Sequence, residues 1–497
     1  MKLPNFFSHR GIILGTHGLP FPRRLLSLTV EQIKTHAHVI GVSGSGKSRF
    51  LAGLFLSMLE NGLPATLIDP HGDLARLVLA HLVRKGVYRD PKAHERIIYL
   101  DLPAAEQNAR FIPYNVLAQH QQPHTTASNV KEAMHRAWPA LAAGAAPMFD
   151  TLVQDGVKVL ISNRMPITAL YRLLTDTRYR DSLLAQEEDQ DVVSFFRDQF
   201  DRLSSRDQAD QAGAALRRAH LMTFSPVLKY SLGQAESILN FRNILDQGQS
   251  LIVNLALPDT EARRLLGCLL TVSAEQGALS RAELPAGQRF GTHHLILDEF
   301  SEFTAQSEEA LSRMLSLTRK YGLHLVLAHQ TWSQTSARLR GALQNVGLEV
   351  VFRLGREDAE YSATMLGRVD PLQVKHQVAD ESAVERTHPV FYSLAEQWER
   401  FTQELQELRP RHAYVCLYSP KRRALPLRLL LKSRSRAVTK VRTPSIPDPE
   451  VDEVTLQRVE QTYLELYFRP KHEIEKEMSK YRNTHTNAQL RRKVALK

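Results

Sequence analysis

The chain has 497 residues, of which 43% are hydrophobic and 24% are charged, and its formal net charge is +11. These values exclude a disordered, collagen-like or coiled-coil chain, and the length predicts two to four domains. Two cysteines are too few for a disulfide scaffold or a cysteine-built zinc module. The sequence has no targeting signal and no apolar stretch of about 18 residues, so we expect a cytoplasmic protein without membrane insertion.

Short apolar runs alternate with helical stretches along most of the chain. They are apolar throughout rather than alternating, which is typical of strands that are covered on both faces. The sequence therefore predicts an α/β fold with a mostly parallel sheet. The expected strands are residues 37–41, 65–69, 96–102, 251–257, 293–300, 323–330 and 349–355.

The segment 108–248 lacks such runs and carries Ala, Leu, Arg and Gln at helical spacing, which predicts an all-α domain inserted into the sheet. Three prolines between residues 438 and 450 indicate a linker, and the apolar stripe beyond it predicts a docking helix. The expected parts are an N-terminal segment with the first part of the core (1–107), the inserted all-α domain (108–248), the second part of the core (249–437), and the linker with a basic helical tail (438–497).

The segment from Gly41 to Ser48 reads GVSGSGKS and fits the P-loop pattern G-x-x-x-x-G-K-[ST]. An expected strand precedes it and a helix-prone stretch follows, as a phosphate-binding loop requires. We expect Lys47 to reach the β- and γ-phosphates of ATP and the Ser48 hydroxyl to bind Mg²⁺. The nucleotide-binding residues predicted here are Gly41, Ser43, Gly44, Ser45, Gly46, Lys47, Ser48 and Arg49.

Two acids end the apolar run LILDE, and an amide ends the following run. At the carboxyl edge of a parallel sheet, Asp298 is predicted to hold Mg²⁺ and Glu299 to act as general base on the attacking water. Gln330 is predicted to sense the γ-phosphate. Such enzymes often need a further cation, frequently from a neighbouring subunit. The arginines considered for this role are Arg319, Arg340, Arg353 and Arg356.

In five pieces the sequence resembles the HerA–FtsK superfamily of DNA-pumping ATPases, and most closely its branch of conjugative type IV coupling proteins and HerA-like helicases. The pieces are HVIGVSGSGKS (38–48), LIDPHGDL (67–74), LILDEF (295–300), RKYGLHLVLAHQ (319–330) and NVGLEVVFRLGREDA (345–359). The resemblance implies a RecA-like core, a hexameric ring that threads DNA, a trans-acting arginine at Arg319 and a nucleotide-side acid at Asp69. A turn-forming role is the alternative for Asp69.

Two departures from the family pattern bear on partners. The membrane-anchored coupling proteins begin with transmembrane helices, whereas this sequence starts almost directly on the ATPase, so docking to a secretion channel through such an anchor is not expected. HerA-like helicases usually begin with a small β-barrel, for which the roughly 35 residues before the P-loop strand are too few.

The leading hypothesis is a ring-forming, ATP-driven DNA translocase with weak sequence preference, in conjugative transfer, DNA processing or defence. Its partners would be DNA, copies of itself, and a relaxase, a nuclease or a secretion channel. Two alternatives remain open. The chain is a secretion-type ATPase that moves protein, or it is a nucleotide-gated scaffold for a partner nuclease.

The charge excess lies in the last 87 residues, which hold 20 Lys/Arg and 9 Asp/Glu. Residues 411–442 carry ten basic side chains and no acid, so they either follow DNA or form a final sheet hairpin (414–418 with 425–431) joined to a basic linker. Pore loops are expected after Leu102 or in residues 331–340. The predicted DNA contacts are Trp332, Arg338, Arg340, Arg434, Arg436, Lys440 and Arg442.

Overall fold

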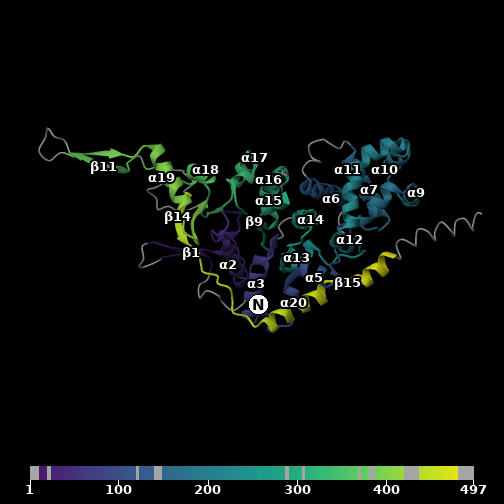
Figure 1. Ribbon diagram of the computed structural model, residues 1–497, viewed down its shortest axis with the longest axis horizontal. Helices are drawn as coiled ribbons and strands as arrows, with labels where there is room; N and C mark the ends of the chain where they lie inside the picture. Colours follow the sequence, from purple (N-terminus) through teal and green to yellow (C-terminus); the bar gives the residue numbers. More distant parts are fainter. Residues whose placement is uncertain are drawn as a thin grey trace, which may run out of the picture. The chain divides into compact units, whose positions relative to one another are not determined.

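The structure is a computed structural model that describes residues 11–18, 24–118, 122–138, 148–285, 290–304, 308–367, 370, 372–379, 387–418 and 436–479. The chain divides into two compact units. Unit 1 contains Met58–His324 and the described residues from Asp448 on, and unit 2 contains the described residues up to Ser57 together with Leu325–Pro447. Both units have α/β architecture (Figure 1).

Unit 1 contains four parallel strands in the order β8-β4-β7-β5. Nearly every residue of these strands is buried, as expected for strands that are covered on both faces. All four overlap runs that were predicted as strands, although β7 begins one residue before its run. They are β4 (Ala65–Asp69), β5 (Ile97–Asp101), β7 (Ser250–Asn254) and β8 (His293–Leu297).

Helices pack around these strands. The predicted docking helix is α20 (Glu453–Tyr467), which packs on β5 and α3; its Leu456, Val459 and Tyr463 are buried, whereas Leu466 is exposed. The Tyr463 hydroxyl donates to the carbonyl of Ile97. The other helices here are α3 (Asp73–Arg84), η1 (Val87–Arg89), α4 (Ala93–Arg96), α5 (Leu102–Gln107), α14 (Thr260–Leu279), η5 (Ser280–Glu283), α15 (Ser301–Thr304), α16 (Glu308–Leu317) and η6 (Thr318–Tyr321).

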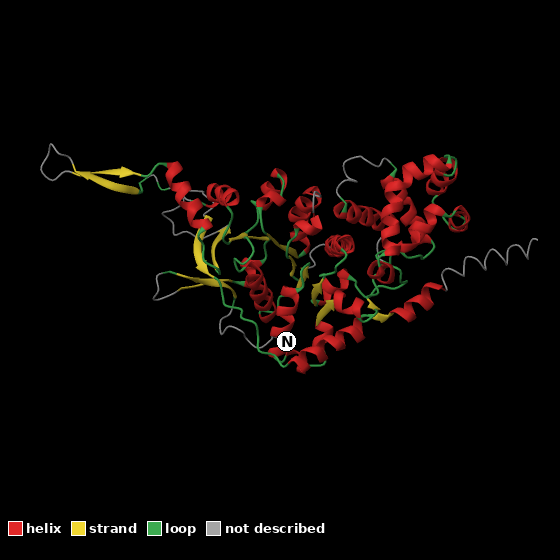
Figure 2. Ribbon diagram, viewed as in Figure 1, coloured by secondary structure: helices red, strands yellow, loops and turns green. Residues whose placement is uncertain are grey.

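Between residues 122 and 247 the named elements are all helices, joined by turns (Figure 2). Most of their large apolar side chains, such as Phe196 and Phe200, are buried, whereas Phe224 is exposed. The preceding two-residue strand β6 (Arg110–Phe111) was not predicted; it pairs with β15 (Arg469–Pro470). The helices are α6 (Pro123–Ala137), α7 (Phe149–Ser162), η3 (Ile167–Ala169), α8 (Leu170–Thr175), α9 (Thr177–Leu184), α10 (Gln190–Ser194), η4 (Phe195–Phe200), α11 (Ser205–Phe224), α12 (Pro226–Leu232) and α13 (Phe241–Gln247).

Unit 2 contains strands in the order β2-β1-β14-β13-β10-β3-β9. The inner strands β10, β3 and β9 are parallel, whereas the others pair antiparallel. The three inner strands match predicted runs. The strands are β1 (Ile12–His17), β2 (Arg24–Leu28), β3 (Ala37–Ile40), β9 (Leu323–His329), β10 (Leu348–Val351), β13 (His412–Tyr418) and β14 (Arg436–Arg442).

Unit 2 also contains a separate two-stranded sheet. This is the hairpin of β11 (Val374–Ala379) and β12 (Thr387–Phe391), which extends away from α19 in Figure 1. The helices are α1 (Val30–Ile33), α2 (Lys47–Glu60), η7 (Trp332–Gln334), α17 (Ala337–Leu343), α18 (Arg356–Leu366) and α19 (Leu394–Gln406). No helix in the described part of the chain combines the length and apolarity that a bilayer crossing needs.

The structure corrects the predicted linker boundary. The predicted linker began at residue 438, but Val438 to Arg442 lie in β14, which pairs antiparallel with β13. Val441, opposite Ala413, is buried, so apolar burial extends the strand beyond the point where prolines suggested a linker. The hairpin partner predicted at 425–431 lies outside the described residues.

Candidate functional site

The predicted P-loop connects β3 to α2 in unit 2. Its backbone turns at Gly44 and Gly46, whose φ angles of 72° and 104° lie in the left-handed region that favours glycine. Lys47 is the first residue of α2 and is only 6% exposed, whereas Ser48 is exposed. The strand, the glycine turn and the helix N-terminus therefore have the arrangement that binds phosphate groups.

Close packing fixes the shape of this loop. A Cβ on Gly41 would lie 2.6 Å from the Phe352 Cβ and 2.8 Å from the Ser45 Oγ, so only glycine fits there. A Cβ on Gly46 would lie 3.1 Å from the backbone nitrogen of Arg411. That nitrogen donates to the Ser45 carbonyl at 2.9 Å. Arg411, which directly precedes β13, thus packs against the loop and holds it in place.

Two arginines anchor the segment after β14 to this region. Arg49 Nη1 donates to the Ile446 carbonyl at 2.6 Å, and Arg411 Nη2 donates to the Thr443 carbonyl at 3.2 Å. Arg49 was predicted to bind nucleotide, and that role stays a prediction. The contact of Arg411 with the P-loop was missed, because the sequence offered no signal beyond a place in the basic stretch.

Gln330 lies beside the start of the P-loop within unit 2. It follows β9, which runs parallel to β3, and the Gly41 N–H donates to the carbonyl of the preceding residue, His329, at 3.3 Å. The side chain of Gln330 is half-buried. The structure therefore brings Gln330 and the P-loop to the same edge of the sheet.

A pair of buried histidines joins the two strands beneath this edge. The Nε2 atoms of His38 and His329 are 2.8 Å apart, and His38 Nδ1 lies 3.7 Å from Glu349 Oε1. Burial lowers the pKa of His329, and nearby His38 and Lys47 lower it further. His329 is therefore neutral, and one ring of the pair donates while the other accepts. Sequence reasoning missed this pair.

The predicted DNA contact at Trp332 is wrong for this structure. Trp332 is 2% exposed, and its indole N–H donates to Ser362 Oγ at 2.9 Å. Arg340 is half-buried, and its guanidinium donates to the carbonyls of Trp332 and Thr335. Arg338 is exposed. The segment after Gln330 is thus largely folded back onto α18 rather than forming an open loop.

The other predicted pore loop, after Leu102, is also absent. Residues 102–107 form α5, which begins directly at the end of β5 because the Asp101 carboxylate accepts the Ala104 N–H at 3.0 Å. An aspartate in this position starts a helix without an intervening loop.

The acidic pair lies in unit 1, directly after β8. Asp298 is 3% exposed and Glu299 is 5% exposed, and the Glu299 N–H donates to Asp298 Oδ1 at 3.1 Å. Glu299 has a φ of 46°, in the left-handed region that residues other than glycine rarely adopt. Backbone strain of this kind gathers at functional sites, where the surrounding structure holds it in place.

Asp69 lies at the same edge of the unit 1 strands as Asp298, because the Asp298 N–H donates to the Ile68 carbonyl at 3.2 Å. Its two carboxylate oxygens accept the N–H groups of His71 and Ala75, both at 2.9 Å. Burial raises the pKa of Asp69, although these backbone donors oppose the shift. The contacts assign it the turn-forming role, and nucleotide contact stays a prediction.

The four arginines considered as a completing cation differ in their exposure and in the bonds of their side chains. Arg319 is exposed on η6, and its guanidinium has no hydrogen bond or ion pair among the described residues. Arg356, by contrast, forms a bidentate pair with Glu399, with both distances at 2.7 Å. The backbone carbonyl of Arg353 accepts the Val42 N–H at 3.0 Å.

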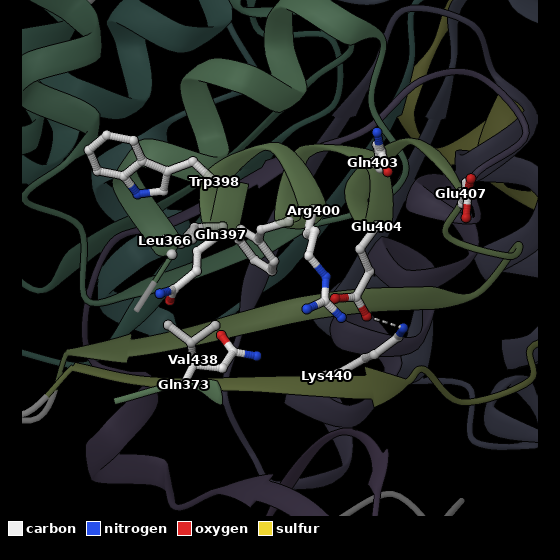
Figure 3. Close-up of a pocket in the computed structure, with 12 residues that line it drawn as sticks. Leu366, Gln373, Gln397, Trp398, Arg400, Gln403, Glu404, Glu407, Val438 and Lys440 are labelled. Carbon is white, nitrogen blue, oxygen red and sulfur yellow. Dashed lines mark hydrogen bonds and ion pairs between the residues drawn. The ribbon is translucent and has the colours of Figure 1, made fainter. Parts of the chain in front are cut away.

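The predicted DNA contacts near β14 are only partly described. Lys440 pairs with Glu404 at 2.6 Å, at the edge of a groove of about 710 Å³ that α19 and β14 line (Figure 3). Arg442 is exposed, Arg436 lies on β14, and Arg434 is outside the described residues. The groove carries both signs of charge, so it does not favour a polyanion.

Comparison with known proteins gives one family match. The family model described as "Type IV secretion-system coupling protein DNA-binding domain" matches residues 24–421. No curated protein matches the chain.

Solved structures of the same fold include the bacterial conjugative coupling protein TrwBdeltaN70 in its unbound form, with 17% identity, a TM-score of 0.51, and coverage of 85% of this chain and 87% of that one. VirB4 of Thermoanaerobacter pseudethanolicus has 12% identity, a TM-score of 0.53, and coverage of 90% and 99%. Plasmid coupling protein TrwB in complex with ADP and Mg²⁺ has 17% identity, a TM-score of 0.50, and coverage of 85% and 88%.

Proposed function

The chain belongs to the family of type IV secretion-system coupling protein DNA-binding domains, and from that premise we propose that it is an ATP-driven DNA translocase. The observation that carries the proposal is the P-loop of unit 2, where Lys47 is the first residue of α2 and Gln330 directly follows the neighbouring strand. Such a loop binds the phosphates of a nucleoside triphosphate. The coupling protein TrwB, which has the same fold, is described in complex with ADP and Mg²⁺.

Magnesium suits the chemistry of two predicted ligands. The Ser48 hydroxyl and the Asp298 carboxylate are oxygen donors, which Mg²⁺ prefers. Within the described ranges, no cluster of three or more His, Cys, Asp and Glu offers a different metal site. When bound, the ion would neutralise charge on the phosphates. Glu299 would take the proton of the attacking water, and Lys47 would hold the phosphates.

The proposed motor is a ring in which each nucleotide lies between two subunits. Arg319 supports this arrangement because its guanidinium is exposed and uncommitted, as an arginine that acts on a neighbour must be. DNA would be held mainly through its phosphates, so binding should depend on salt and little on base sequence.

Turnover measurements test this function. The rate of ATP hydrolysis is measured with and without single- and double-stranded DNA for the wild type, Lys47→Ala, Arg319→Ala and Glu299→Gln. DNA should raise the wild-type rate, and Glu299→Gln should lower it about a hundredfold or more while nucleotide binding persists. Glu302→Gln is the matched control, since among the described residues the Glu302 carboxylate pairs with Arg263, at 3.2 Å.

Three results would contradict the proposal in different ways. A rate that ignores DNA would favour protein cargo instead. A Glu299→Gln chain that keeps its biological effect would favour a nucleotide-gated scaffold. A chain that stays monomeric with every nucleotide would exclude a ring.

A further inference from the structure

A fully buried arginine joins three helices of unit 1. Arg136, on α6, is 0% exposed, and its Nη2 lies 2.8 Å from Oε2 of Glu275, on α14. Its Nε donates to Glu132 Oε1 at 3.1 Å, and its Nη1 lies 3.7 Å from the sulfur of Met314, on α16. The guanidinium therefore connects the helical segment 122–247 with α14 and α16, which come later in the chain.

This charge is costly to bury. Removing two ions from water costs several kcal/mol per ion, and well-packed apolar side chains in their place are often as stable or more so. Glu275 is itself only 1% exposed, and Arg313 Nε approaches its Oε1 at 3.5 Å. Hydrogen bonds and ion pairs define direction more sharply than apolar packing does. Glu275, which pairs with both Arg136 and Arg313 of α16, is therefore better suited to fixing where α16 lies than to stabilising the fold.

The position of α16 determines the position of Arg319. The Thr318 hydroxyl donates to the carbonyl of Met314 at 2.8 Å, which ties η6 to the last turn of α16. Arg281 Nη1 donates to the Tyr321 carbonyl at 2.7 Å and holds the other end of η6. The Arg319 guanidinium makes no hydrogen bond or ion pair with a described residue, so the backbone of η6 determines where this side chain can extend.

We infer that Arg136 and Glu275 are positioning residues for Arg319, so that donation of this arginine to a neighbouring subunit depends on the helical segment that carries Arg136. The inference rests on the proposed function. According to the inference, the Arg136 contact on α6 affects the rate of ATP hydrolysis in the neighbouring subunit. Neither residue touches the nucleotide; both act through α16 and η6.

Oligomers that mix two variants can distinguish the positioning of Arg319 from a general structural defect. A Lys47→Ala chain cannot hydrolyse but still offers Arg319, whereas an Arg319→Ala chain can accept an arginine but offers none. Mixing the two should restore turnover. Arg136→Met, which is apolar and long, is then added either to the arginine donor or to the acceptor, and the double change Arg136→Met with Glu275→Met avoids leaving an unpaired buried carboxylate.

The expected result is asymmetric. Arg136→Met in the donor should lower the restored rate about tenfold to a hundredfold, because small displacements of a reacting group have effects of that size. The same change in the acceptor should leave the restored rate intact. Arg180→Met in the donor is the matched control, since Arg180 is equally buried in the helical segment but bonds Asp201, Leu173 and Thr177 instead.

Equal losses in donor and acceptor would overturn the inference, because they would show a general structural role. An undiminished rate with the donor variant would overturn it as well. If the unmodified pair of Lys47→Ala and Arg319→Ala chains restores nothing, the trans role of Arg319 fails, and the inference falls with that part of the proposed function.

Discussion

Lowering the pH should destabilise unit 1 through His293, a buried side chain on β8. Its Nε2 lies 2.9 Å from Thr66 Oγ1, and its Nδ1 has no hydrogen-bond partner among the described residues. Burial lowers the pKa of His293 to about 3 from its ordinary value of 6.5, with further lowering by His294 and Arg281. The folded chain therefore disfavours the charged ring.

The sign of the effect follows from proton binding. Below pH 6.5 His293 binds a proton in the unfolded chain but stays neutral in the folded chain. The free energy of unfolding therefore falls as the pH falls, until the pKa of the folded chain is reached. Between about pH 7.5 and about pH 5, this single group should remove about 2 kcal/mol.

Urea unfolding of the wild type and His293→Gln at the two pH values measures this contribution. The variant should lose about 2 kcal/mol less than the wild type over the same interval, because glutamine does not titrate. The exposed His472 provides the control, and His472→Gln should behave as the wild type does. Equal losses for the wild type and His293→Gln would refute the reasoning, whatever the other buried histidines contribute.

Two further predictions concern unit 2. Gly46→Ala should abolish binding of a fluorescent ATP analogue, because the new methyl group would lie 3.1 Å from the Arg411 nitrogen at a φ of 104°; Gly341→Ala, with nothing within 4 Å, is the control, and equal affinities would contradict the prediction. Trp332→Phe should lower the free energy of unfolding by about 1 kcal/mol through loss of its bond to Ser362, without changing affinity for DNA. A selective loss of DNA affinity would restore the earlier view of Trp332 as a DNA contact.

The inner strands were predictable because their signal is local. Runs such as residues 65–69 and 323–329 are apolar on both faces, and burial on both sides of a parallel sheet requires that pattern. The glycines and lysine of the P-loop were predictable for a similar reason, since phosphate binding dictates both residue types and spacing.

Features that depend on distant partners were not predictable. Trp332 follows a strand end and is flanked by polar residues, which suggested exposure, but Ser362 and Asp358 of α18 enclose it. Glu299 could be identified as an acid at a strand end, whereas its left-handed backbone could not. The strand β14 was not predicted, and the linker was placed too early, because pairing with β13 outweighs the nearby prolines.

The support behind the P-loop has a consequence for how the protein is made. Ile446, whose carbonyl holds Arg49, follows that arginine by 397 residues. Contacts between such distant parts of a chain form late, and a nascent chain folds from its N-terminal end as it leaves the ribosome. A truncated product that ends before Arg411 would still contain the sequence GSGKS. Its P-loop would lack the contacts with Arg411 and Ile446. We therefore expect nucleotide binding to arise only after Ile446 has been synthesised.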